Sequence, residues 1–183
     1  MPTIYLDMDG VLADFNTAAR SYLNASREDE QDAEQNGRWP KKSWGRLVKA
    51  PNFYRHLPKM PLADELVALA YRFKNELGWE IRILTAIPTN NEVPDVFQDK
   101  FDWMAEHYPG IRVCFGPYST DKHKHAQPGD ILVDDRESNC REWGQARGAA
   151  IRVRSQDYRA ALDELRELLD VKLSLRRLRD IGN

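Results

Sequence analysis

Five polar residues of this 183-residue chain stand at or just beyond the ends of three apolar, strand-like segments. They are Asp7, Asp9, Thr85, Asp134 and Asp135. Four carboxylates gathered in one place would repel one another unless a cation lay among them. Carboxylate oxygens suit hard divalent ions, and Mg²⁺ keeps several waters and is commonly shared with a phosphate group. These residue types therefore indicate Mg²⁺ as the cofactor and a small phosphate ester as the partner.

The spacing of the first acidic pair also suits catalysis. Residues two apart project to the same side of an extended chain, so Asp7 and Asp9 can face one substrate. One carboxylate can then act as a nucleophile and the other as a proton donor, while Gly10 permits a tight turn after them. Acids at a strand end can instead cap the next helix. The second pair and Thr85 favour the catalytic interpretation.

The segments that must position these residues alternate between strand and helix patterns. We expect strands over residues 3–6, 80–84, 111–115, 130–133 and 149–153, and helices over 11–23, 63–77, 95–108, 142–147 and 158–178. This alternation implies right-handed crossovers and a parallel sheet with helices on both faces. The predicted fold class is therefore α/β, a Rossmann-like three-layer α/β/α sandwich. Ligands bind beyond the carboxyl ends of the strands in such sheets, where the five polar residues stand.

Residues 16–60 interrupt this alternation. They contain an acidic stretch over residues 27–35, which we interpret as a solvated loop or helix face, and several aromatic residues. We predict a small helical cap here, inserted after the first strand of a single domain whose core is formed by residues 1–15 and 61–183. The aromatic residues could stack on a nucleobase or could form the core of the cap, and both alternatives stay open. They include Trp39, Trp44 and Phe53.

Composition and charge exclude several classes of protein. The net charge of −2, from 27 basic and 29 acidic residues, argues against wrapping a nucleic acid polymer. No apolar run approaches the roughly 20 residues that span a bilayer. A strand-like segment begins at Thr3, which predicts no signal peptide and a cytoplasmic setting. Two cysteines, Cys114 and Cys140, are too few for a disulfide framework. A P-loop enzyme is disfavoured because its glycine-rich motif is missing from the sequence.

Three segments resemble motifs of the haloacid dehalogenase (HAD) superfamily. Residues 6–15, Leu-Asp-Met-Asp-Gly-Val-Leu-Ala-Asp-Phe, resemble its first motif, particularly that of the 5′(3′)-deoxyribonucleotidases. Residues 84–86 resemble the second motif, and residues 131–136 the fourth. The similarity extends to residues 52–54 and 100–103. The resemblance implies a HAD-like fold and a Mg²⁺-dependent phosphomonoester hydrolase that acts on nucleoside monophosphates through an aspartyl-phosphate.

The resemblance also implies roles for individual residues. Asp7 attacks phosphorus, and Asp9 protonates the leaving group, activates water and touches the metal through its backbone carbonyl. Thr85 bonds the transferring phosphoryl group. Asp134 ligates Mg²⁺, and Asp135 supports the metal shell. Two further residues are expected to contact substrate, namely Ala86 in the second motif and Phe15 after the first.

The family also places a lysine before the fourth motif, to pair with phosphate and the nucleophile. We prefer Lys124, which stands ten residues before Asp134. Lys122 is the alternative, because Asp121-Lys122 resembles the local sequence of the family more closely, although it requires a two-residue insertion. Both lysines could also be solvated loop charges. Lys100 is expected as a second phosphate contact, and its alternative interpretation is an exposed helical lysine.

Three functional hypotheses follow from the sequence. The first is a nucleotidase, the second a HAD phosphatase for a sugar phosphate or another small phosphomonoester, and the third a non-catalytic phosphate-binding module. The presence of both Asp7 and Asp9 argues against the third. The basic tail over residues 172–179 either projects from the molecule or pairs with a second copy in a homodimer.

Overall fold

The computed structural model describes residues 1–36, 39–88 and 95–181, and five parallel strands form its central sheet. The strands are β1 Thr3–Leu6, β2 Glu80–Thr85, β3 Arg112–Phe115, β4 Ile131–Asp134 and β5 Ala149–Arg152. Their order is β3-β2-β1-β4-β5, with β1 in the centre. Because β1 pairs with both β2 and β4, its carboxyl end lies between theirs. This topology confirms the predicted α/β class.

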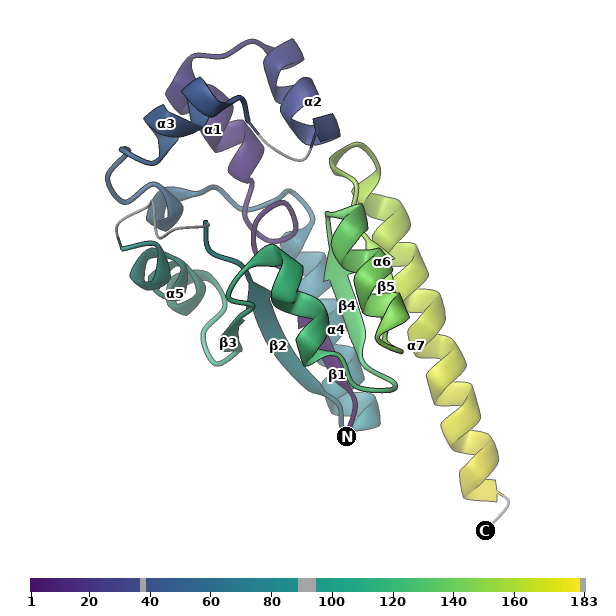
Figure 1. Ribbon diagram of the computed structural model, residues 1–183. Coiled ribbons are helices and arrows are strands. Elements are labelled where there is room, and N and C mark those ends of the chain that lie inside the picture. Colours follow the sequence, from purple (N-terminus) through teal and green to yellow (C-terminus); the bar gives the residue numbers. More distant parts are fainter. Residues whose placement is uncertain (37–38, 89–94, 182–183) are drawn as a thin grey trace.

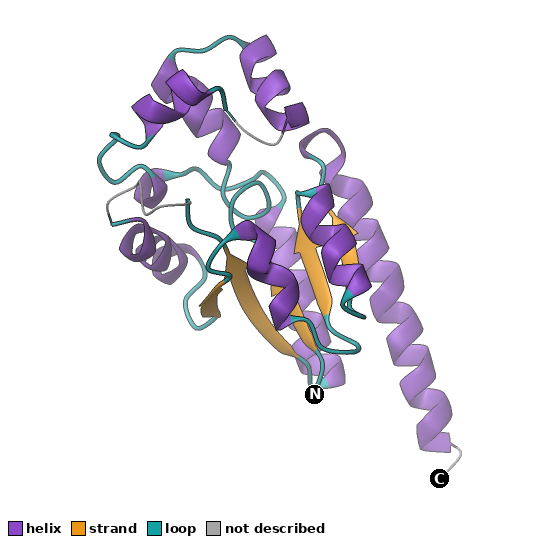
Figure 2. Ribbon diagram, in the orientation of Figure 1, coloured by secondary structure: helices purple, strands orange, loops and turns teal. Residues whose placement is uncertain are grey.

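Helices cover both faces of the sheet, as Figures 1 and 2 show. On one face, α4 (Ala63–Leu77) contacts β2, α7 (Tyr158–Ile181) contacts β5, and the two helices contact each other. On the other face, α6 (Glu137–Gln145) packs on β4 and β5, together with the 3-10 segment η3 (Ser119–His125). These three layers position the ends of the strands.

The alternation of side chains along β1 divides the core in two. Ile4 and Leu6 belong to the larger apolar cluster, which includes buried residues of α4 and α7. Tyr5 points to the opposite face, where its ring packs edge-on against Trp143 of α6 with 5.2 Å between centroids. Successive strand residues point to opposite faces, so both faces of β1 are buried.

Three helices form a separate group beyond the carboxyl ends of the strands (Figure 1). They are α1 Phe15–Leu23, α2 Arg27–Asn36 and α3 Lys41–Leu47. The two chain segments that connect this group to the sheet are bonded to each other: the Asp14 amide donates to Pro58 O at 2.7 Å, and the Met60 amide to Leu12 O at 2.8 Å. These paired stems lie next to the proposed boundaries of the cap, residues 16–60.

The returning stem is also fixed to α5 (Val96–His107). The 3-10 turn η1 (Tyr54–His56) packs against this helix. The indole Nε1 of the fully buried Trp103 donates to Leu57 O at 2.7 Å, and Arg55 forms an ion pair with Asp102. The three-helix group is therefore connected to α5 through its returning stem, in addition to the pairing of its two stems.

The predicted elements differ from the structure at two helix starts. The helix expected over residues 11–23 begins only at Phe15, because residues 11–14 form a turn and Asp14 caps the helix by accepting from the Thr17 amide at 3.0 Å. The helix expected over residues 142–147 begins earlier, at Glu137. The acidic stretch over residues 27–35 lies within helix α2, and its described side chains are largely exposed.

The last turns of α7 extend beyond the body of the molecule (Figure 1). They carry three exposed apolar side chains, Val171, Leu175 and Leu178, which are 54%, 47% and 67% exposed. Among the described helices, none combines the length and apolar character that crossing a membrane requires.

Candidate active site

A tight turn after β1 presents the first acidic pair. The Asp7 amide continues the ladder by donating to Val133 O at 2.9 Å. The chain then wraps around the carbonyl of Met8, which accepts from the amides of residues 11, 12 and 13 at 3.3, 2.8 and 2.8 Å. Gly10 has a φ of +77°, which glycine adopts without strain. The turn thus leaves the acids at the carboxyl edge of the sheet.

The carboxylate of Asp7 is buried and held by one of its two oxygens. Its Oδ1 accepts from the Met8 amide at 2.7 Å and lies 2.7 Å from Lys122 Nζ. Among the hydrogen bonds of the described residues, none reaches Oδ2. Asp7 is therefore oriented through Oδ1, and Oδ2 makes no hydrogen bond to the described residues.

Asp134, at the end of β4, is bonded through both of its oxygens. Oδ1 accepts from the Arg136 amide at 2.9 Å, and Oδ2 lies 2.7 Å from Lys122 Nζ. The Asn139 amide nitrogen donates to both oxygens, at 2.9 and 3.0 Å, and Asn139 Oδ1 accepts from Ser119 at 2.9 Å. Sequence reasoning missed Asn139 because a single asparagine in a weakly patterned segment carries no signal of burial.

The structure places Lys122, rather than the expected Lys124, beside the acids. Lys122 is 2% exposed and bridges Asp7 and Asp134, whereas Lys124 is 65% exposed and pairs with Asp121 at 2.5 Å. Both lysines lie in η3, whose tight helical turns direct residue 122 inwards and residues 121 and 124 outwards. Counting residues along an ungapped alignment could not detect this difference in direction.

Three carboxylates could hold a metal ion. Asp7, Asp134 and Asp135 each offer one oxygen, and these atoms lie within 4.8 Å of one another. Burial and the neighbouring carboxylates raise the pKa of Asp7 to about 6, against the opposing effect of Lys122. Burial and the charges of Asp134 and Asp7 also raise the pKa of Asp135 well above its usual range. The cluster therefore carries more negative charge than Lys122 offsets, which fits a divalent cation.

Asp9 lies outside this three-oxygen group and forms a second polar centre. Its Oδ2 accepts from Lys100 Nζ at 2.6 Å, and the same ammonium donates to Thr85 Oγ1 at 2.8 Å and to Ala86 O at 2.7 Å. Lys100 is fully buried, so its interpretation as an exposed helical lysine is wrong. The charge of Asp9 contributes to the raised pKa of Asp7.

An aromatic cluster borders this second centre. The Phe15 ring lies 5.5 Å from that of Phe53 and 5.8 Å from that of Tyr54, between centroids. The Tyr54 ring in turn covers Lys100, with 4.9 Å from Nζ to its centroid. Trp39 is only 5% exposed and belongs to the apolar core. Phe15 is therefore linked to the second centre through Tyr54, while Trp39 contributes mainly to packing.

Comparison with known proteins gives a consistent result. Residues 1–171 match the model of the family described as 5′ nucleotidase, deoxy (pyrimidine), cytosolic type C. The chain belongs to this family. The cytosolic type C nucleotidases are part of the HAD superfamily, and the predicted family is confirmed.

Individual relatives of this nucleotidase-family chain carry related names. A protein of Staphylococcus epidermidis is 33% identical over 140 residues, covering 72% of this chain and 73% of the relative. One of Bordetella bronchiseptica is 30% identical over 147 residues, covering 73% of each. Both are named "Putative 5'(3')-deoxyribonucleotidase". The match to a Staphylococcus aureus protein of the same name covers 49% of this chain and 44% of that relative's length.

Solved structures of low sequence identity share the fold. L-2-haloacid dehalogenase from Xanthobacter autotrophicus superposes with a TM-score of 0.50 at 17% identity, covering 87% of this chain and 81% of that one. A second dehalogenase gives a TM-score of 0.52 at 15% identity, with coverages of 92% and 96%. These similarities establish the HAD fold of the nucleotidase-family chain.

Proposed function

We propose that this chain is a Mg²⁺-dependent phosphatase that hydrolyses nucleoside monophosphates, with deoxynucleotides as its preferred substrates. The observation that carries the proposal is the orientation of Asp7 at the edge of the sheet. Its Oδ1 is fixed by the Met8 amide and Lys122, and its Oδ2 is left to attack. Family membership and the names of the relatives support the substrate class.

The first half of the proposed reaction transfers the phosphoryl group to the protein. Asp7 Oδ2 attacks phosphorus, so a bond from this oxygen to phosphorus forms while the bond from phosphorus to the ester oxygen breaks. Asp9 gives its proton to the departing alkoxide. Lys122 remains beside Asp7 and offsets the negative charge that spreads over the phosphoryl oxygens.

The second half releases phosphate. Asp9, now ionised, takes a proton from water, whose oxygen attacks the phosphorus of the aspartyl-phosphate and frees Asp7. Thr85 can assist both halves: its Oγ1 accepts from Lys100, so its own hydroxyl hydrogen is left to donate to a phosphoryl oxygen. Ala86, next to Thr85, is proposed as a further phosphate contact.

The proposed metal site comprises Asp7, Asp134 and Asp135, with the backbone carbonyl of Asp9 as a further ligand. Bound Mg²⁺ would neutralise charge on the phosphoryl group and orient it for in-line attack. The chain's own contribution is to fix these ligands. Asn139 and the Arg136 amide hold the Asp134 carboxylate, and Met8 and Lys122 hold Asp7.

The aromatic cluster is the proposed surface for the base. Phe15 lies at the junction of cap and core and is partly buried, and it packs with Phe53 and Tyr54. An aromatic face accepts any base by stacking, which supports a nucleotide over a sugar phosphate. A sugar phosphate or another small phosphomonoester remains the second candidate, because the catalytic acids act on the phosphate alone.

The remaining proposals concern setting and assembly. Membership of a family of cytosolic type supports a cytoplasmic enzyme. The net charge of −2 supports a small-molecule substrate over a nucleic acid polymer. Leu168, Val171, Leu175 and Leu178 of α7 follow a three-four-three spacing, which supports pairing with a second copy in a homodimer. Sedimentation velocity would detect that dimer, and a monomer at all concentrations would contradict it.

A panel of phosphomonoesters tests the proposed function. We expect the highest kcat/KM on deoxynucleoside 5′- or 3′-monophosphates, lower values on ribonucleotides, and little release of phosphate from sugar phosphates. Chelation of divalent ions should abolish turnover. Asp7→Asn should lower kcat by at least about 1,000-fold, because it removes the nucleophile.

Two results would contradict parts of the proposal. A sugar phosphate that exceeds every nucleotide would overturn the substrate class while leaving the mechanism in place. Equal activity of the wild type and a correctly folded Asp7→Asn variant would remove Asp7 as the nucleophile.

A further inference from the structure

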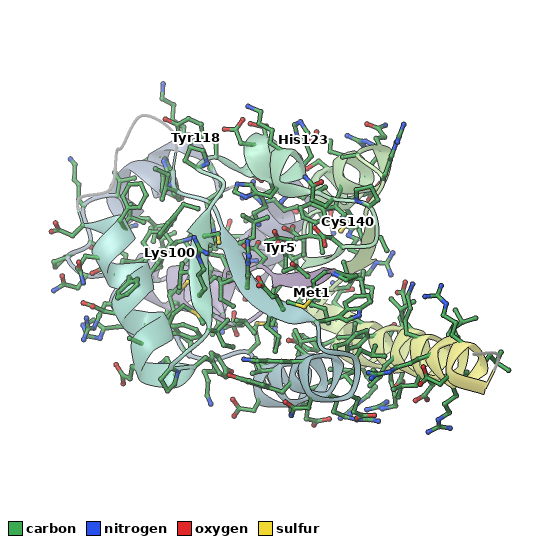
Figure 3. All side chains as sticks on the ribbon, turned by 90° about the horizontal axis from the view of Figure 1, so that it is seen from below. Met1, Tyr5, Lys100, Tyr118, His123 and Cys140 are labelled. Atoms are coloured by element: carbon green, nitrogen blue, oxygen red, sulfur yellow. The ribbon has the colours of Figure 1, made fainter. Side chains whose placement is uncertain are left out.

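Lys100 is a buried lysine with no free N–H group. Its side chain is fully buried, and Nζ donates to Asp9 Oδ2 at 2.6 Å, Thr85 Oγ1 at 2.8 Å and Ala86 O at 2.7 Å. An ammonium group has three donors, so these acceptors use all of them. Figure 3 labels Lys100, which reaches from α5 toward the strands. A phosphate could bond Lys100 only by displacing one of these partners.

The remaining side of the ammonium is covered by the cap. The Tyr54 ring lies over Nζ, with 4.9 Å to its centroid, and Tyr54 is itself buried. This cation–π contact adds to the three hydrogen bonds. Lys100 is thus enclosed by the turn after β1, the end of β2 and the returning stem of the cap, and its position is fixed.

Asp9, by contrast, has little else to hold it. Its side chain is 30% exposed, and among the described residues Lys100 is the one side chain that bonds its carboxylate. Its Oδ1 is enclosed and has no hydrogen-bond partner in the described part of the chain. The direction in which Asp9 points therefore depends on Lys100.

We propose that Lys100 is a positioning residue that holds the Asp9 carboxyl group in place for proton transfer to the leaving group. This inference rests on the proposed function, in which Asp9 is the acid. It replaces the expected phosphate contact of Lys100 with a role through Asp9. The proton leaves an Asp9 oxygen and ends on the ester oxygen as its bond to phosphorus breaks, and Lys100 keeps all of its own protons.

The leaving group distinguishes this role from phosphate binding. An alkyl phosphate, such as a deoxynucleoside 5′-monophosphate, needs a proton on its departing oxygen, whereas 2,4-dinitrophenyl phosphate leaves readily without one. A residue that acts through the acid should therefore affect the alkyl ester most. A residue that binds phosphate, or only supports the fold, should affect both esters equally.

The test compares kcat/KM on these two esters for Lys100→Met and for Lys74→Met, a surface lysine of α4 as control. The ratio kcat/KM reports the first half-reaction, whereas kcat also contains the release of phosphate by Asp9, which is common to both esters. We expect Lys100→Met to lower kcat/KM on the nucleotide by about 100-fold and on the dinitrophenyl ester by less than about 10-fold, because general acid catalysis contributes in this range. Asp9→Asn should show the same selectivity. The double variant should be no slower than Asp9→Asn alone, since both changes disable one group.

Equal losses on the two esters, or additive losses in the double variant, would overturn the proposal. If Lys100→Met does not fold, Lys100→Gln, which retains N–H donors, takes its place under the same criteria. Failure of the proposed function has a different signature, because the wild type would then hydrolyse neither ester in an Asp7-dependent manner.

Discussion

Two lysines separated by one residue differ completely in their surroundings. Lys122 bridges two buried carboxylates, and burial alone would lower its pKa, but Asp134 and Asp7 raise it, so the group stays charged. Lys124 is a surface residue whose partner, Asp121, is also in contact with solvent. This pair of residues offers a direct test of which lysine serves the site.

Lys122→Ala should reduce kcat strongly and destabilise the fold by about 3–5 kcal/mol, because it leaves two buried carboxylates without their cation. Lys124→Ala should leave both kcat and the melting temperature nearly unchanged, since exposed ion pairs contribute little. Kinetics on a nucleotide and thermal melts check both variants. The reverse order of effects would contradict the assignment of Lys122.

The acids could be located from the sequence, and the residues that hold them could not. Asp7, Asp134 and Asp135 follow buried apolar segments, so the parallel topology alone brings them together. Which lysine points inwards depends on the local helical geometry of η3, and the burial of Asn139 depends on packing against that segment. Neither property is encoded in residue type or spacing.

At the scale of elements, the turn after β1 approaches the chain just after β4 closely, with Gly10 next to Asp135. A Cβ added to Gly10 would lie 2.6 Å from Asp135 Oδ2, whereas a Cβ added to Gly78, at the end of α4, would meet no atom within 4 Å. Both glycines have a positive φ, +77° and +76°. An alanine at either position would therefore suffer the same backbone strain. The two positions differ only in whether the added Cβ meets Asp135.

Gly10→Ala should raise the Mg²⁺ concentration needed for half-maximal activity, because Asp135 must move away. Gly78→Ala should not change it, although each variant should lose about 1 kcal/mol of stability from the strained backbone. Titration of activity with Mg²⁺, together with thermal melts, separates the two effects. Equal Mg²⁺ requirements in both variants would show that Asp135 has no part in metal binding.

Element boundaries were predicted best where apolar periodicity is strong. The helix over residues 63–77 was predicted with the observed bounds, because six of its residues are buried at helical spacing. The start of α6 was missed because only Asn139 and Trp143 of that helix are buried, which leaves its first turn without an apolar pattern. The first helix was extended too far because residues 11–13 are apolar but fold around the Met8 carbonyl.

For the whole molecule, the acidic cluster lowers stability when no metal is bound. The pKa of Asp7 in the folded protein is about 6, against an ordinary value of 3.8. A raised pKa means that Asp7 binds its proton more tightly in the folded state than in the unfolded state. Protonation of Asp7 therefore stabilises the folded state at low pH, and this stabilisation is lost as pH rises past 6. Asp135 acts in the same direction.

The metal-free protein should therefore become more stable between pH 7 and pH 5, by about 1 kcal/mol from Asp7 alone. Mg²⁺ at pH 7 should raise the melting temperature, since the ion favours the ionised carboxylates. Asp7→Asn, as the control, should reduce this pH dependence. A metal-free melting temperature that falls from pH 7 to pH 5 would contradict the raised pKa values.

The central position of β1 affects how the chain reaches the native register between β1 and its neighbours β2 and β4. Leu6 and Met8 are fully buried, and they alternate with Asp7 and Asp9, while Leu6 is in register with both Ile83 and Val133. A shift of β1 by one residue would exchange these positions and push carboxylates among aliphatic side chains, which costs far more than one mispaired bond. The acids of the proposed active site thereby also penalise misaligned strands during folding.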